Sequence, residues 1–203
     1  SAPGFLVNRA LTPYLVEAFM LMEEGVSKET IDRAAEDFGM PMGPIELADR
    51  VGLDICLSVA TMLKEELDDP MPEIPSWLKE KVDKGELGKK TGKGLYDYDS
   101  NGKPKKANHT KSADAETVDR LVLPMVNTCM GCLRKGVVAD EDTLDAAMIF
   151  GTGFAPFRGG PMRYATERGH ADIVKSLSRL AEKHGDRFAP DPGWNVETAQ
   201  QAA

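Results

Sequence analysis

The sequence predicts an all-α protein made of two tandem, homologous helical domains. Three observations predict this class: apolar residues recur at helical spacing along most of the chain, glycine and proline stand where helices would begin and end, and the second half repeats the first. We expect residues 1–110 to form the first helical domain and residues 111–203 a divergent second copy. The two copies are expected to pack against each other as a pseudo-dimer within one chain.

The repeat is carried by phrases that return in the same order. Between them, Asp32 of the first copy corresponds to Asp145 of the second. Small insertions change the offset from 111 positions at the first phrase to 117 at the last. The matched phrases are "RALTPYLVEAFMLMEEG" (9–25) with "RLVLPMVNTCMGCLRKG" (120–136), and "GPIELADRVG" (43–52) with "GPMRYATERG" (160–169).

Each copy is expected to contain four helices. In the first copy, an apolar stripe from Val7 predicts a helix that ends at Gly25, and Ser27 is a typical cap for the next one. Proline opens the third helix and glycine closes it. The other expected helices cover residues 44–52 and about 54–67 in the first copy, and about 118–133, 141–148, 161–169 and 171–184 in the second.

Between the copies, the sequence predicts a short helix and several loops. A proline-rich loop (68–77) leads into a helix from Trp77, and residues 95–98 alternate like a short extended segment. The lysine-glycine stretch 89–94 reads either as a solvated turn, which the residues favour, or as a mobile cationic loop near an anionic ligand. The polar stretch 101–116 reads as a linker and holds the expected domain boundary.

Composition excludes several classes of protein. Hydrophobic residues make up 41% and charged residues 29%, which is typical of a soluble globular protein. The net charge of −8 argues against a nucleic-acid partner, and no apolar run is long enough for membrane insertion. Three cysteines and no recognisable signal peptide favour a cytoplasmic location.

Cys129 and Cys132 form a C-x-x-C pair that could belong to a redox site or to half of a zinc site. No second cysteine pair follows, and no histidine lies at ligand spacing. Both cysteines fall on the inner side of an expected helix. We therefore expect buried thiols and no metal site.

Asn8 is the most informative polar residue near the start of the chain. Its position favours the face of the helix away from the apolar stripe, where it reads as a surface or capping asparagine. The repeat adds a second observation, because the matching position in the second copy is Asp119. A residue needed to build the repeated unit is expected in both copies, and the asparagine occurs in one.

Three phrases together resemble the C-terminal part of 3-hydroxyacyl-CoA dehydrogenases. They are "PGFLVNRALTPYLVEA", "GMPMGPIELADRVGLD" and "GKKTGKGLYDYD", in the family's order. The duplication resembles the multifunctional enzymes of fatty-acid β-oxidation, which carry two such domains in tandem. The resemblance implies the 6-phosphogluconate dehydrogenase C-terminal-like fold and hydride transfer from 3-hydroxyacyl-CoA to NAD, giving 3-ketoacyl-CoA.

The family's NAD-binding domain and catalytic histidine-glutamate pair have no counterpart in this sequence. No G-x-G-x-x-G phrase opens a βαβ unit here. We therefore expect a C-terminal fragment that is inactive alone and binds no NAD, which is the cofactor of the parent enzyme. The expected partners are an acyl-CoA substrate, an upstream NAD-binding domain, and further an enoyl-CoA hydratase domain and a thiolase subunit.

The resemblance also assigns roles to residues. Asn8 takes the position of a catalytic asparagine that holds the substrate oxygens, and four further positions face the acyl chain in the family, although core packing explains each of these singly as well. These expected substrate-binding residues are Leu11, Pro41, Met42 and Leu47. Asp119 departs from the asparagine, which puts a substrate role for the second copy in doubt. The alternative function is a free-standing all-α binding or scaffold module without catalysis.

Overall fold

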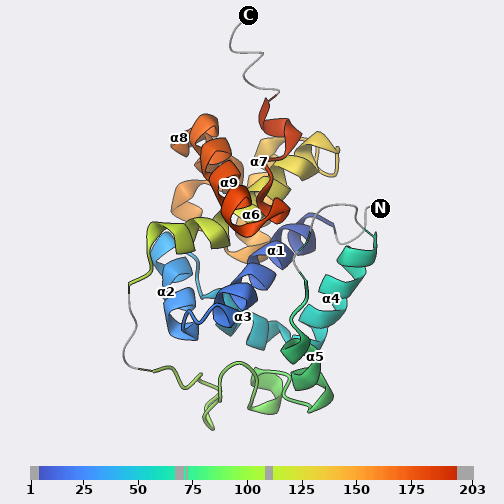
Figure 1. The fold of residues 1–203 in the computed structure, drawn as a ribbon, viewed down its shortest axis with the longest axis vertical. Coiled ribbons are helices and arrows are strands. Elements are labelled where there is room, and N and C mark those ends of the chain that lie inside the picture. Colours follow the sequence, from blue (N-terminus) through green and yellow to red (C-terminus); the bar gives the residue numbers. More distant parts are fainter. Residues whose placement is uncertain (1–4, 67–70, 72, 108–111, 196–203) are drawn as a thin grey trace, which may run out of the picture.

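The computed structural model describes residues 5–66, 71, 73–107 and 112–195, and its described residues form helices without any named strand (Figure 1). This confirms the predicted all-α class. The helices of the first half are α1 (Phe5–Glu23), α2 (Lys28–Phe38), α3 (Pro44–Val51), α4 (Leu53–Glu66) and α5 (Ser76–Asp83). Those of the second half are α6 (Ala115–Arg134), α7 (Glu141–Thr152), α8 (Pro161–Arg168) and α9 (His170–His184).

The predicted helix starts are confirmed by side-chain caps. The Ser27 hydroxyl accepts a hydrogen bond from the Thr30 backbone N–H at 3.3 Å, and Asp140 accepts one from Thr143 at 2.7 Å. Helix α6 begins three residues earlier than its apolar stripe indicated. The reason is Asp114, whose carboxylate accepts from the Thr117 N–H at 2.7 Å and so caps a turn that the stripe does not include.

The matched aspartates Asp32 and Asp145 perform the same task in the two halves. Each is buried on the second helix of its half and accepts hydrogen bonds from the first N–H groups of the third helix. Asp32 Oδ1 lies 2.8 Å from the Ile45 nitrogen, and Asp145 Oδ1 lies 2.7 Å from the Met162 nitrogen. A carboxylate there also interacts favourably with the positive end of the helix dipole.

Glycine precedes the third helix in both halves because the capping aspartate leaves no room for a side chain. A Cβ atom on Gly43 would lie 2.1 Å from the Asp32 carboxylate, and one on Gly160 would lie 2.3 Å from Asp145. The proline that follows sits at the first helical position, where no N–H is needed. The repeated glycine-proline pair is thus a consequence of this buried cap.

Replacement of Asp32 by alanine is expected to lower the free energy of unfolding by about 2 kcal/mol or more. The change removes the cap of α3, and it leaves the buried hydroxyl of Tyr96, which donates to Asp32 at 3.0 Å, without an acceptor. Urea unfolding measures the loss. Asp37→Ala, on the exposed side of the same helix, is the matched control, and equal losses from both variants would contradict the assigned cap.

The stretch after α5 is fixed to α2 and α3 by the two tyrosines of its "GLYDYD" phrase. The backbone N–H groups of Leu95 and Tyr96 donate to buried Asp49 at 2.7 and 2.8 Å, and the Tyr98 hydroxyl donates to the same carboxylate at 3.0 Å. The expected extended segment is reduced to isolated bridges such as Lys93 with Asp97. Within the lysine-glycine stretch, Lys89–Thr91 form a short 3-10 turn.

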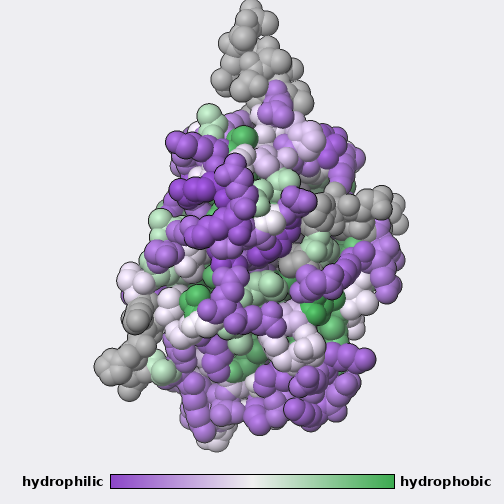
Figure 2. Space-filling model, in the orientation of Figure 1, coloured by the Kyte–Doolittle hydropathy of each residue, from purple (hydrophilic) through white to green (hydrophobic). Residues whose placement is uncertain are grey.

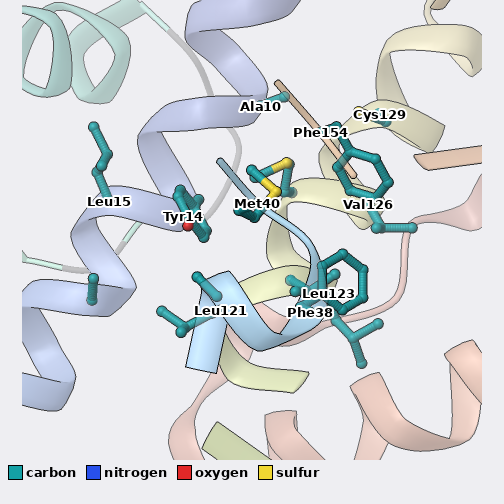
Figure 3. Close-up of a cluster of buried hydrophobic side chains, with 14 of the residues drawn as sticks. Ala10, Tyr14, Leu15, Phe38, Met40, Leu121, Leu123, Val126, Cys129 and Phe154 are labelled. Carbon is teal, nitrogen blue, oxygen red and sulfur yellow. The ribbon is translucent and has the colours of Figure 1, made fainter. Parts of the chain in front are cut away.

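One hydrophobic core joins the two halves. Helix α1 lies against α6, and Figure 3 shows Ala10, Tyr14 and Leu15 of α1 in one cluster with Leu123 and Val126 of α6. Helix α1 also contacts α7, while α2 contacts α6. Because α1 and α2 match α6 and α7 in the repeat, these two contacts are reciprocal, as in a symmetric dimer interface.

Buried ion pairs strengthen this junction between the halves. Arg120 of α6 reaches the Glu17 carboxylate of α1 at 2.5 Å, and the exposed fractions of the two side chains are 4% and 2%. Arg187, near the end of the described chain, donates to the same carboxylate at 2.9 Å. The expected domain boundary at residues 110 and 111 lies outside the described residues.

The two cysteines of the C-x-x-C pair are buried thiols, as expected. Cys129 is fully buried in α6, and this burial raises the pKa of its thiol well above the ordinary value. In the part of the chain that the structure describes, no group of three or more histidine, cysteine, aspartate or glutamate residues is placed to hold a metal ion.

Most of the face shown in Figure 2 is hydrophilic, with small separate hydrophobic patches near its middle. Across the described residues, no helix has both the length and the apolar character needed to cross a membrane.

Candidate functional site

An apolar pocket of about 100 Å³ opens between α1 and α4, and Asn8 lies on its wall. Helix α1 supplies Asn8 from its exposed side, together with apolar side chains that point toward α4. The apolar wall is formed by Leu11, Leu15 and Phe19 of α1 and by Val51, Ile55 and Val59. An amide beside an apolar hollow suits a ligand with a polar group next to a hydrocarbon segment.

The wall residues on and before α4 were missed by the sequence analysis, although the sequence contains a signal for them. Ile55 and Val59 recur at a spacing of four, which places them on one face of α4, while Val51 is the last residue of α3. The Ile55 side chain lies on the pocket wall and is 47% exposed, which is a large fraction for an aliphatic side chain. A second apolar face on this helix, apart from the core, would have indicated the pocket.

Cys56 also lines the pocket, yet it is poorly suited to act as a nucleophile. Burial raises the pKa of its thiol to about 12, so the reactive thiolate is scarce near neutral pH. Its Sγ lies 3.8 Å from the Ala48 carbonyl oxygen, to which it donates. The pocket therefore offers binding and orientation, with Asn8 as its exposed polar group.

The structure brings Leu11 together with Asn8 and places the other three expected acyl-facing residues elsewhere. Leu11 is half-buried on the same pocket wall. Pro41 is exposed and lies close to Gly153 of the second half, where a Cβ atom would come within 2.6 Å of the proline ring. Met42 and Leu47 are half-buried, Leu47 packs against the core, and neither lines this pocket.

Asp119, the counterpart of Asn8, lies in a different environment. It is buried and forms a bidentate ion pair with Arg168 of α8, with N–O distances of 2.6 and 2.9 Å. Its carboxylate holds α6 to α8. At this position of the repeat, the first half therefore has an exposed amide beside a pocket, and the second half has a buried carboxylate in an ion pair.

A larger pocket of about 250 Å³ lies at the junction of the two halves and contains none of the residues predicted from the sequence as site residues. Its walls carry both signs of charge. Glu17 and Asp191 face Arg134 and Arg187, and these groups pair with one another. Within this lining, Arg134 pairs with Asp191 and Arg187 pairs with Glu17.

Comparison with known proteins supports the family suggested by the sequence. Residues 4–98 match the family model described as 3-hydroxyacyl-CoA dehydrogenase, C-terminal domain. The chain is 40% identical to the fatty acid oxidation complex subunit alpha of Idiomarina loihiensis over 95% of its own length, and 37% identical to that of Shewanella loihica over 92%. It spans 30% and 28% of the lengths of these two relatives.

Solved structures share the fold over the full length of the chain. The 3-hydroxybutyryl-CoA dehydrogenase of Escherichia coli superposes with a TM-score of 0.76 at 24% identity, covering 100% of this chain and 61% of that one. The dehydrogenase part of multifunctional enzyme 1 from C. elegans gives 0.72 at 25% identity, covering 97% and 48%. Residues 4–98 thus match the C-terminal domain family of 3-hydroxyacyl-CoA dehydrogenases, the family that the three sequence phrases resemble.

Proposed function

We propose that this chain is the substrate-side portion of an NAD-dependent 3-hydroxyacyl-CoA dehydrogenase of fatty-acid oxidation. The observation that carries the proposal is the exposed amide of Asn8 beside an apolar pocket, within a segment that matches this family. The amide provides a hydrogen-bond donor for a substrate oxygen, and the apolar wall provides a surface for the adjoining hydrocarbon.

In this proposal, Asn8 orients the oxygen at the reacting carbon. Oxidation converts the 3-hydroxyl group to a carbonyl. A donor that binds the hydroxyl oxygen holds the carbon–hydrogen bond that must break in one orientation. The proton and the hydride pass to groups outside this chain. The contribution of the described residues is therefore to bind and orient the substrate, and Asn8 is the group that touches it.

The described residues do not fit the dinucleotide cofactor. A Rossmann site needs a strand, a glycine-rich turn and a helix, and the described part of the chain has no named strand. NAD would supply the hydride acceptor in the whole enzyme, from a domain beyond the residues of this chain.

The second half is proposed as a built-in partner for the first, with residues 1–110 and 111–203 as the two domains of a pseudo-dimer. The reciprocal contacts of α1 with α7 and of α2 with α6 support this arrangement. The relatives are named as alpha subunits of a fatty acid oxidation complex. We propose on that basis that the whole protein works beside an enoyl-CoA hydratase domain and a thiolase subunit, in the cytoplasm.

The proposed function is tested by comparing this chain with the whole protein that contains it. With 3-hydroxybutyryl-CoA and NAD, the whole protein is expected to produce NADH, whereas the isolated chain is expected to produce none and to bind no NAD by calorimetry. A whole protein without dehydrogenase activity would favour the scaffold alternative. Micromolar NAD binding by the isolated chain would contradict the division of roles proposed above.

A further inference from the structure

The second half carries one connected polar cluster at the positions that match the pocket wall of the first half. Residues 43–52 match residues 160–169 at a constant offset of 117. The helices that follow, α4 and α9, begin at Leu53 and His170, which are also 117 positions apart. Asn8 corresponds to Asp119 at the offset of 111. The pocket residues Val51, Ile55 and Val59 correspond to Arg168, Asp172 and Ser176.

Arg168 is bound to the other three members of this cluster. Besides its two bonds to Asp119, its Nε donates to Asp172 at 2.7 Å and its Nη2 donates to the Ser176 hydroxyl at 2.9 Å. Its Nη1 lies 3.0 Å from the hydroxyl of Tyr164, to which it donates. One guanidinium therefore joins α6, α8 and α9 through its full fork of donors.

This side chain lies largely inside the protein. The exposed fractions of the Arg168 and Asp119 side chains are 21% and 12%, whereas Asn8 is exposed in the first half. At the position of Arg168 the first half has Val51, a side chain too short to cross the space toward α1. The three matched helices therefore surround an open apolar pocket in the first half and a guanidinium group in the second half.

We infer that the second half contains the same pocket in a closed form, with the Arg168 side chain standing in the place of an apolar ligand. Of the two matched places in the described residues, only the one in the first half is then open to a ligand. The closed copy fixes α8 and α9 to α6, the helix against which α1 packs. Removal of this charge pair together with its polar partners Asp172 and Ser176 should reopen the space for a small apolar ligand, because neither a buried charge nor a polar wall is then left.

Xenon is the probe for this inference, since small apolar cavities in proteins take it up. Crystals of the unsubstituted chain under xenon pressure are expected to show a xenon peak between α1 and α4 and none between α6, α8 and α9. The fourfold variant Asp119→Asn/Arg168→Val/Asp172→Ile/Ser176→Val gives the second half the residues of the first at the four matched positions. Its crystals are expected to show a new peak between α6, α8 and α9.

The reciprocal variant Asn8→Asp/Val51→Arg moves the polar pair into the first half and should abolish the peak between α1 and α4. Xenon between α6, α8 and α9 in the unsubstituted protein would overturn the inference, as would a folded fourfold variant without the new peak. If the fourfold variant does not fold, retention of xenon in the folded reciprocal variant overturns it instead. Xenon occupancy reports the cavity itself, independently of whether the whole protein is a dehydrogenase.

Discussion

Replacement of Asn8 by alanine in the whole enzyme is expected to lower kcat by roughly 10²- to 10³-fold, the usual cost of removing one donor aimed at a reacting oxygen. Acyl-CoA binding should change less, because the hydrogen bond gains most of its strength when charge shifts in the transition state. Thermal stability should be almost unchanged, since Asn8 is exposed. Steady-state kinetics and thermal melts on one preparation measure all three quantities.

Two control variants distinguish the loss of the hydrogen-bond donor from a change in side-chain shape and from a loss of stability. Asn8→Asp keeps the size of the side chain and removes its N–H donors, so it should lose as much turnover as Asn8→Ala. Asp119→Ala should retain turnover and lose stability, because the half-buried Arg168 side chain loses its bidentate partner. Full turnover in Asn8→Ala, or a loss explained by unfolding, would make Asn8 an ordinary helix-start residue.

Replacement of Glu17 by alanine is expected to lower the free energy of unfolding by about 3–5 kcal/mol, the range for breaking a buried ion pair by removing one partner. Its side chain is 2% exposed and pairs with Arg120 and Arg187, so two arginines would lose the same carboxylate. Because Glu17 lies on α1 and Arg120 on α6, the variant tests how firmly the two halves hold each other. Urea denaturation provides the measurement.

The matched control is Glu167→Ala, which breaks an exposed pair between Arg163 and Glu167 within one helix. Those side chains are 66% and 59% exposed, and such pairs contribute about 0–1 kcal/mol. Glu17→Gln keeps the shape and one acceptor oxygen, so it should lose less than Glu17→Ala. Similar losses for Glu17→Ala and Glu167→Ala would show that the junction does not depend on this pair.

The positions of the helices were predictable because they depend on neighbours a few residues apart. Stripes at a spacing of three and four predict which face is buried, and Ser27, Asp140, Pro44 and Gly52 mark helix ends through local backbone chemistry. The repeat was readable for the same reason. The family followed from phrases that lie almost entirely within single elements and their ends.

The candidate site was predictable in part. The sequence indicated Asn8 by the contrast with Asp119 and Leu11 by resemblance, and the structure places both on one pocket wall. Pro41, Met42 and Leu47 lie away from that wall, because the ends and faces of α2 and α3 are oriented by packing against the second half and the core. Their proposed contact with an acyl chain stays a prediction.

The sequence by itself therefore determined the helices, the duplication and the family, while the tertiary structure decided which polar groups meet. Arg168 and Asp119 lie 49 residues apart, and Arg120 and Glu17 lie 103 apart, so no local pattern pairs them. A buried charge needs a partner wherever the fold supplies one, and that choice depends on how helices cross in space. The contrast between an open pocket in one half and a filled one in the other depends on how α4 and α9 pack against their neighbouring helices.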